Sequence, residues 1–338
     1  MSQYYRPIPQ TDPHRAPGAL TLAGGWTWFD TVEVLSRDAP PRLIAAADLP
    51  DDVRTRLCAP RAPVAGMGLD APRLMGILNV TPDSFSDGGA HAAADAALDH
   101  ARTMARDGAD IIDVGGESTR PGATEIAVDE ERRRTVPVIA AMRAEGLTTP
   151  VSIDTRKRAV AQAAVDAGAG MVNDVSGFTF DTGLAGYCAE AGLPVCVMHA
   201  QGDPQTMQRA PRYDDVLLDV YDFLAARAAA LESAGIPRAR IVIDPGIGFG
   251  KTRAHNLALL ARLSLFHSLG CAVLLGASRK RFIGDISGVG DAGARVHGSI
   301  AVGLGAVAQG VQILRVHDVA ETTAALSLWW AVQAGGDR

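Results

Sequence analysis

The chain has 338 residues, of which 47% are hydrophobic and 21% are charged, an ordinary globular composition that allows one large domain or two smaller ones. Its formal net charge is −6 and its pI is about 5.7. That balance argues against a protein that binds nucleic acid or an anionic membrane, because such proteins carry a basic patch or run, although a locally basic pocket stays possible.

The four cysteines are scattered and form no C-x-x-C pair: Cys58, Cys188, Cys196 and Cys271. This usage indicates reduced thiols in a cytosolic protein, and it is unlike a disulfide framework or a zinc site. The first 18 residues contain no apolar core of signal-peptide length, and no apolar run reaches the roughly 18 residues of a membrane span. We therefore expect a cytoplasmic protein with no membrane partner.

Residues 1–70 differ from the rest of the chain, because proline is dense there. Two apolar-alternating runs, 19–22 and 26–34, flank Gly24-Gly25 and predict a β-hairpin. Two of the four tryptophans fall in the second run, so we expect the hairpin to pack against the main body. We interpret residues 1–70 as an N-terminal extension whose role the sequence does not reveal.

Residues 74–89, LMGILNVTPDSFSDGG, begin the regular part of the chain. A nearly unbroken apolar run suits a strand that is buried on both faces, as in a parallel sheet. The run ends at Asn79 and passes at once into polar and turn residues. One such strand alone would suggest only a surface turn, but the same pattern recurs seven more times.

Eight strand-like runs alternate with helical segments over about 265 residues. The expected strands are 74–80, 109–115, 151–154, 171–174, 195–199, 241–244, 272–276 and 311–315, and the clearest helices are 92–106, 129–145, 158–167, 214–234 and 319–333. Strict β/α alternation with eight repeats predicts a closed (β/α)8 barrel, an α/β fold, over residues 71–338. The alternative, an open doubly wound sheet, would need a Gly-rich dinucleotide turn after its first strand.

Polar groups follow every predicted strand, at the end of a barrel where chemistry takes place. In chain order they are Asn79, Asp113, Asp154, Asn173, His199, Asp244, Lys280, and Arg315 with His317. A single Asp at a strand end is more often a helix N-cap than a catalytic group, and we expect that role for Asp113 and Asp174. Capping alone does not explain the whole series.

A cationic set among these groups suits a multiply charged anion. Its members are Lys280, Arg315 and His317, supported by Arg279 and Arg120. Asn79 is a neutral oxygen donor, which suits Mg2+, since that ion keeps several waters and takes one or two protein oxygens plus phosphates.

A second set, Asp154, Asn173, Asp244 and Lys280, can read the donor and acceptor edge of a flat heterocycle such as an aminopyrimidinone ring. Internal salt bridges, for example Asp244 to Lys280, remain the structural alternative.

Two loops are glycine-rich. Residues 245–252 resemble a P-loop superficially, but the motif needs glycine where Pro245 stands, so we interpret them as a tight loop that lets Phe249 reach a flat ligand. Residues 119–122 and 82–89 suit loops that close over the site, with plain surface connections as the alternative.

Taken together, the segments resemble the dihydropteroate synthases, the folate-pathway enzymes of the pterin-binding family. The matching pieces are LNVTPDSFSDGG (78–89), DVGGESTRPGA (113–123), SIDT (152–155), VNDVSG (172–177), VMH (197–199), DPGIGFGKT (244–252), GASRKRFIG (276–284) and RVHDV (315–319). They occur in order and span nearly all of residues 73–319, but not residues 1–70. The family fold is a (β/α)8 barrel, usually a homodimer.

The resemblance implies the reaction. The amine of p-aminobenzoate attacks the CH2 group of (7,8-dihydropterin-6-yl)methyl diphosphate, which gives 7,8-dihydropteroate and pyrophosphate. Family roles then fall on matching positions. The pterin would be held by Asp154, Asn173, Asp244 and Lys280, and lined by Met198 and Phe249. Sulfonamides are expected to compete with p-aminobenzoate.

The remaining roles implied by the resemblance concern the metal and the two other substrate groups. Asn79 would bind Mg2+. The diphosphate would be held by Thr119, Arg315 and His317, and the p-aminobenzoate site would be shaped by Pro121, Phe85 and Ser278. Cations and a metal suit the charge that grows on a departing diphosphate.

The expected catalytic residues are Asp154 and Lys280. Asp154, as an anion near the reacting carbon, would stabilise a cation-like intermediate, while the aniline nitrogen needs no strong general base. Two rival functions stay open. A methyltransferase that uses methyltetrahydrofolate and a corrinoid partner shares the barrel and the pterin grip, but it needs neither the diphosphate site nor these loops. A catalytically silent paralogue would bind pterin or partners only.

Overall fold

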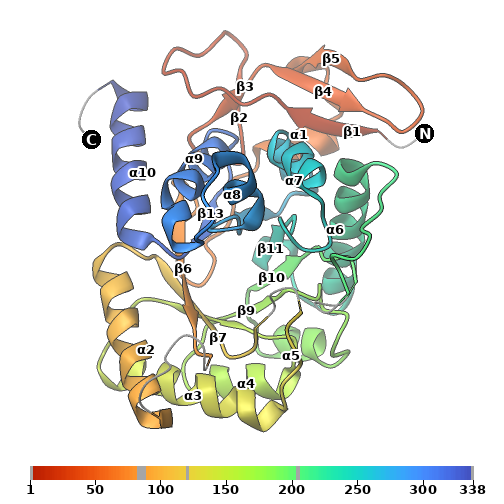
Figure 1. Cartoon of the computed structure of the whole chain (residues 1–338). Helices are drawn as coiled ribbons and strands as arrows, with labels where there is room; N and C mark the ends of the chain where they lie inside the picture. Colours follow the sequence, from red (N-terminus) through yellow and green to blue (C-terminus); the bar gives the residue numbers. More distant parts are fainter. Residues whose placement is uncertain (1–2, 82–88, 119–121, 203–205, 336–338) are drawn as a thin grey trace.

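The computed structural model describes residues 3–81, 89–118, 122–202 and 206–335. Eight parallel strands close into a barrel in the order β10-β11-β12-β13-β6-β7-β8-β9, enclosed by helices (Figure 1). The strands are β6 (Arg73–Asn79), β7 (Ile111–Gly115), β8 (Val151–Asp154), β9 (Met171–Asp174), β10 (Val195–Met198), β11 (Ile241–Asp244), β12 (Ala272–Leu275) and β13 (Ile313–Val316). The predicted barrel is confirmed, and the open doubly wound sheet is excluded.

The helices between and after these strands cover the outside of the barrel (Figure 1). They are α2 (Gly89–Arg106), α3 (Val128–Ala144), α4 (Arg158–Asp166), α5 (Leu184–Glu190), α6 (Val216–Ser233), α7 (Arg253–Leu260), α8 (Arg281–Ser287), α9 (Val296–Val307) and α10 (Val319–Ala334). The five helices that the sequence predicted are all present. In the part of the chain that the structure describes, no helix is long and apolar enough to cross a membrane.

Side chains alternate along each strand between the helices and the barrel interior, as a period of two requires. The outward positions pack in the large core under the helices; examples are Ile112, Ile153 and Val172. The inward positions near the strand starts form a separate apolar cluster that contains Met75, Ile111, Met171, Cys196, Val242, Leu274 and Ile313. Further along most of these strands the inward positions are polar, for example Asp113, Asn173, Asp244 and Arg315, which gathers the polar side chains at one end of the barrel.

The apolar end of the barrel is closed by the segment that leads into β6. Val64, Met67 and Leu69 are buried against the inward cluster. A short antiparallel bridge, in which the backbones of Val64 and Met67 pair with each other, holds this segment in place. Because this end is plugged by aliphatic side chains, the polar end is the one left to receive a ligand.

The N-terminal part of the chain lies at one side of the barrel (Figure 1). Its elements are β1 (Tyr4–Pro7), β2 (Leu20–Thr21), β3 (Trp28–Phe29), β4 (Thr31–Leu35), β5 (Arg42–Ala45) and α1 (Asp51–Cys58). The predicted hairpin is present as the antiparallel pair β2–β3, but it is short. The second run breaks at Asp30, and its later half, β4, joins a three-stranded sheet with β1 and β5.

These N-terminal elements have a core of their own that includes Leu22, Phe29, Val32 and Leu57. They are attached to the barrel by hydrogen bonds to backbone carbonyls, among them Trp26 Nε1 to Val307 at 2.9 Å and Arg61 Nη2 to His267 at 3.0 Å. The expectation that the tryptophan-bearing segment packs against the main body is therefore confirmed.

Candidate active site

Inward-facing polar side chains from three neighbouring strands, β7, β8 and β9, meet Arg315 of β13 at the carboxyl end of the barrel. Arg315 donates from Nε to Asp113 Oδ2 at 2.6 Å and from Nη2 to Asp154 Oδ2 at 2.9 Å. Asn173 donates from Nδ2 to the same oxygen of Asp113 at 3.0 Å. The Arg315 guanidinium and the Asn173 amide thus hold the carboxylates of Asp113 and Asp154 in a fixed arrangement. Arg315 forms internal ion pairs with both carboxylates at this end of the barrel.

The predicted capping role of Asp113 is wrong. Asp113 is fully buried on the inner face, in line with Ile111, and it holds Arg315 and Asn173. Its second oxygen, Oδ1, is buried and has no hydrogen-bond partner among the described residues. Such an oxygen is costly unless a ligand or water supplies a donor.

Asp174 has the opposite orientation, because its position on β9 is one residue after the inward-facing Asn173. Its carboxylate accepts from the backbone N–H of Ser176 at 2.6 Å and of Phe178 at 2.9 Å. It therefore caps backbone groups as predicted, but in a turn and not at a helix start. Phe178 in this turn has a φ of 59°.

Burial dominates the electrostatics of the two strand-end carboxylates that face the interior. It raises the pKa of Asp154 to about 7; the Arg315 charge opposes this rise and Asp113 adds to it. Burial also raises the pKa of Asp244, against the Gly246 N–H, which donates to Asp244 Oδ1 at 2.7 Å, and against Lys280. Perturbed carboxyl groups of this kind are typical of functional sites.

Asn79, Gly115 and Asp154 lie side by side on three adjacent strands. A Cβ atom on Gly115 would lie 3.7 Å from Asn79 Oδ1 and 3.7 Å from Asp154 Oδ2. The glycine therefore keeps the space between the amide and the carboxylate open. Asn79 ends β6, as the sequence predicted.

Asp244, Met198 and Arg315 converge beside the same opening. Met198 pairs with Asp244 across β10 and β11. A Cβ atom on Gly276, just after β12, would lie 3.5 Å from Asp244 Oδ2 and 4.0 Å from Arg315 Cβ. A second glycine thus leaves room beside a buried carboxylate.

Lys280 lies immediately before α8, and its Nζ is 4.1 Å from the centroid of the Phe249 ring. A cation over an aromatic face is attracted by the ring quadrupole. The contact joins the loop after β11 to the loop after β12, and the sequence analysis had assigned each of these loops to the site separately. It places a positive charge above a flat aromatic ring.

The loop that carries Phe249 is fixed from behind by Lys251. The Lys251 ammonium donates to the carbonyl of Gly246 at 2.9 Å, to that of Phe249 at 3.0 Å and to His199 Nδ1 at 2.8 Å. Burial and the Lys251 charge lower the pKa of His199 to about 3, so the ring is neutral and its Nδ1 accepts. Burial lowers the pKa of Lys251 itself to about 7.

Glycines bring this loop unusually close to the end of β10. Gly246 has a φ of 68°, and a Cβ atom there would lie 1.9 Å from the carbonyl oxygen of His199. Gly250 is equally restricted, since its Cβ would lie 2.5 Å from the carbonyl oxygen of Gln201. The sequence analysis noticed the glycines but missed Lys251; a lysine beside three alternating glycines was the available signal.

His317 and Ser278 are neighbours after β13 and β12. Ser278 Oγ lies 3.0 Å from His317 Nδ1 and accepts from the His317 backbone N–H at 3.3 Å. Arg279, which was expected to support the cationic set, forms an ion pair with Asp318, with Nε 3.1 Å from Oδ2. Arg279 also has a φ of 59°, a sparsely populated backbone conformation that often marks functional sites.

A buried charge network supports the strand-end loop after β7. Lys157 Nζ lies 3.2 Å from Glu117 Oε1 and 2.9 Å from Glu131 Oε2, and it donates to the Ile126 carbonyl at 2.7 Å. Arg156 completes the set with Glu117 at 3.0 Å. The two ends of the loop, at 117 and 126, are thereby fixed to α3 and to the start of α4.

Four of the residues predicted for the site, Phe85, Thr119, Arg120 and Pro121, lie outside the described residues. The other ten, Asn79, Asp154, Asn173, Met198, Asp244, Phe249, Ser278, Lys280, Arg315 and His317, follow or end strands at the same barrel end. Within the described ranges no group of three or more His, Cys, Asp or Glu side chains is arranged to hold a metal ion.

The chain is similar to several known proteins. The family model described as pterin binding enzyme matches residues 75–317. Dihydropteroate synthase of Escherichia coli (strain K12) is 48% identical over 260 residues, which cover 77% of this chain and 91% of that protein.

Two solved structures of Xanthomonas albilineans dihydropteroate synthase are also similar. The one with 4-aminobenzoic acid has a TM-score of 0.76 and 50% identity, covering 81% of this chain and 98% of that chain. The complex with 7,8-dihydropteroate has a TM-score of 0.74 and 47% identity, covering 81% and 99%.

Proposed function

The chain belongs to the pterin binding enzyme family, and from that premise we propose how its own residues divide the work of a dihydropteroate synthase. It is a transferase of folate biosynthesis that condenses (7,8-dihydropterin-6-yl)methyl diphosphate with p-aminobenzoate. A C–N bond forms between the amine and the CH2 carbon, the C–O bond to the diphosphate breaks, and the nitrogen loses one proton. The products are 7,8-dihydropteroate and pyrophosphate.

The observation that carries the assignment of residues is the ring of inward polar groups around Arg315. We assign the polar edge of the pterin to Asp154, Asn173, Asp244 and Lys280. Asp113 Oδ1, which has no hydrogen-bond partner in the described part of the chain, adds a further acceptor beside them. An aminopyrimidinone edge presents paired N–H donors, which buried carboxylate oxygens accept well.

The faces of the pterin ring are assigned to Met198 and Phe249. Phe249 is held in place by the Lys251 contacts and carries the Lys280 charge on its ring. A thioether and a phenyl ring are polarizable and suit a flat heterocycle. The p-aminobenzoate site is assigned to Ser278 together with Phe85 and Pro121.

The diphosphate is assigned to Arg315 and His317, with Thr119 and Arg120. A guanidinium has five N–H donors in a planar fork, of which Nε and one Nη2 hydrogen hold Asp113 and Asp154. The fork can therefore address an anion without releasing both carboxylates. His317, which follows β13 two residues after Arg315, would supply a second group to the diphosphate. Its ring is held by Ser278.

The donor set fits Mg2+ carried by the substrate. Asn79 presents a neutral amide oxygen beside the space that Gly115 keeps open. Since Mg2+ usually binds through one or two protein oxygens plus phosphates and waters, a dedicated cluster of acids is not required. Asn79 would hold the ion, and the ion would neutralise charge on the leaving diphosphate.

Asp154 is assigned the central catalytic role. As the CH2–O bond breaks, positive charge spreads into the dihydropterin, and a carboxylate next to Asn79 stabilises it. Arg315 orients Asp154 by the hydrogen bond to Oδ2 and favours its ionised form. Lys280 assists by binding the pterin edge above Phe249.

The decisive assay measures pyrophosphate release from the pterin diphosphate, with and without p-aminobenzoate. We expect release that depends on p-aminobenzoate and yields dihydropteroate. Methyl transfer from methyltetrahydrofolate to a corrinoid, without pyrophosphate release, would instead identify the methyltransferase. Pterin binding without turnover would identify a silent paralogue.

Three wider assignments complete the proposal. We propose a homodimer, to be tested by light scattering after size-exclusion chromatography. All four cysteines are free thiols, which supports a cytoplasmic location, to be tested by cell fractionation. We propose residues 1–70 as an extension and 71–338 as the pterin-binding barrel, to be tested by expressing 71–338 alone.

A further inference from the structure

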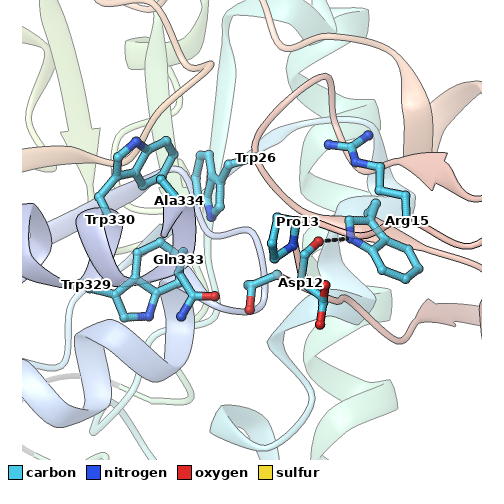
Figure 2. A pocket seen from close by; sticks show the side chains of 10 residues that line it. Asp12, Pro13, Arg15, Trp26, Trp329, Trp330, Gln333 and Ala334 are labelled. Atoms are coloured by element: carbon cyan, nitrogen blue, oxygen red, sulfur yellow. Dashed lines mark hydrogen bonds between the residues drawn. The ribbon is translucent and has the colours of Figure 1, made fainter. Parts of the chain in front are cut away.

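The four tryptophans of the chain all line one pocket, where the N-terminal elements meet α10 (Figure 2). The pocket has a volume of about 450 Å³. Trp26 and Trp28 come from the N-terminal side, and Trp329 and Trp330 come from the last helix. A volume of this size lies within the range of small-molecule sites, which are typically lined by aromatic side chains and a few polar groups.

The indole walls are held in fixed orientations. Trp28 donates from Nε1 to the Asp12 carbonyl at 2.8 Å, and Trp26 donates to the Val307 carbonyl at 2.9 Å. The rings of Trp26 and Trp330 are 5.9 Å apart at 61°, and those of Trp329 and Trp330 are 5.8 Å apart. Rigid aromatic walls bind a flat ring without first losing side-chain freedom.

The pocket is separate from the pterin site. Its walls are built from residues 11–28 and 329–334, which lie outside the family match at residues 75–317. α10 begins directly after the catalytic end of β13, and its 16 residues carry the chain about 24 Å toward the other end of the barrel. The pocket is therefore a second site, separate from the one at which the barrel reaction takes place.

The polar groups of the lining indicate the charge of the ligand. Asp12 and Arg15 contribute one charge of each sign, so neither a cation nor an anion is favoured. Gln333 and Thr11 supply a neutral amide and a hydroxyl, and Figure 2 shows Gln333 beside Trp329. We propose that this pocket binds a neutral planar heteroaromatic molecule of one or two fused rings, stacked on the indoles and hydrogen-bonded to Gln333.

Intrinsic fluorescence reports this pocket specifically, because the chain has no tryptophan elsewhere. The probe is adenine, a neutral bicyclic ring that does not absorb where indole emits, and it is titrated into the full-length protein. We expect a saturable fluorescence change. Tetramethylammonium and acetate serve as the cationic and anionic probes, and we expect both to bind more weakly.

Two variants locate the response. Trp329→Ala should raise the half-saturating adenine concentration at least about fivefold, since one aromatic contact contributes about 1 kcal/mol beyond its buried area. The matched control is Leu328→Ala, which removes an exposed neighbour on the same helix and should leave the value unchanged. Gln333→Leu keeps every indole, so it tests the hydrogen bond even if Trp329→Ala does not fold.

The proposal is overturned if adenine gives no saturable change up to its solubility limit. It is also overturned if tetramethylammonium or acetate binds more tightly than adenine, or if Trp329→Ala and Gln333→Leu both respond as the wild type does.

Discussion

Replacing Lys251 by methionine tests whether the loop that carries Phe249 is held in place from behind. The substitution keeps the approximate length of the side chain but removes the ammonium. That group donates to the carbonyls of Gly246 and Phe249 at 2.9 and 3.0 Å and to His199 Nδ1 at 2.8 Å. We expect the KM for the pterin diphosphate to rise about tenfold, equivalent to roughly 1.4 kcal/mol, with a smaller change in the KM for p-aminobenzoate. The reason is that Phe249 is assigned to the pterin face alone.

The effect on stability follows from two opposing magnitudes. Three buried acceptors lose their donor, at about 1–3 kcal/mol each. Against this, burial lowers the pKa of Lys251 from 10.5 to about 7, so holding the charge inside costs about 5 kcal/mol relative to the unfolded chain. The two effects largely offset, and we expect the variant to fold with a free energy of unfolding within a few kcal/mol of the wild type at pH 7.

The pH dependence separates these effects. The pKa of Lys251 is lower in the folded protein than in the unfolded chain. Its contribution to the free energy of unfolding is therefore fully present above pH 10.5 and is lost as the pH falls toward 7. Between pH 9 and pH 7 the wild type should therefore lose about 2 kcal/mol that Lys251→Met does not lose, measured by urea denaturation at each pH. Arg253→Met, which removes an exposed neighbouring charge, is the control. A wild-type-minus-variant difference that is flat across this range, together with an unchanged KM, would refute the role given to Lys251.

Three further substitutions test the site. Asp154→Asn keeps the shape of the side chain but removes its charge, and we expect kcat to fall by roughly 100-fold or more in the pyrophosphate assay; near-normal turnover would contradict the catalytic role. Asp113→Ala removes the carboxylate that accepts from both Arg315 and Asn173 and should cost about 3–5 kcal/mol in urea denaturation, whereas Ser152→Ala, also fully buried, should cost far less; equal losses would argue against the ion-pair cluster. Gly246→Ala would place a Cβ atom 1.9 Å from a backbone oxygen, so we expect loss of pterin binding by calorimetry, while Gly186→Ala, with no atom within 4 Å of its Cβ, should bind normally.

The barrel was predictable because its strands are local signals. Runs such as 151–154 and 241–244 are apolar on the outward positions and bounded by turn residues, and the structure places both strands at those residues. The break at Asp30 was not predictable in the same way. β4 pairs with β1, and Val34 lies opposite Tyr5, a partner that no local pattern within residues 26–34 reveals.

The sequence predicted which strand ends contribute side chains to the candidate site, but not which of these side chains pair with each other. Asp113 and Asp174 both end apolar runs, so the sequence treated them alike. The difference between them is one of parity: Asp113 is two residues after the inward Ile111, whereas Asp174 is three after the inward Met171. Counting positions from an inward residue would have placed Asp113 in the barrel and Asp174 outside it. The pairing of Arg315 with Asp113 and Asp154 depends on barrel closure, in which β13 pairs with β6 and so comes within one strand of β7.

Charge balance explains how an acidic chain can receive a diphosphate. Three carboxylates, Asp113, Asp154 and Asp244, are buried at the polar end of the barrel together with Lys251, and the partly exposed Arg315 and Lys280 lie beside them. Each charge is tolerated because an opposite one lies near it, so the ring is close to neutral although the chain carries −6. A diphosphate can then enter without meeting a net negative field. In the assignment proposed above, it would draw on cations whose positions are fixed by the carboxylates that would hold the pterin, so both halves of the first substrate would depend on one set of ion pairs.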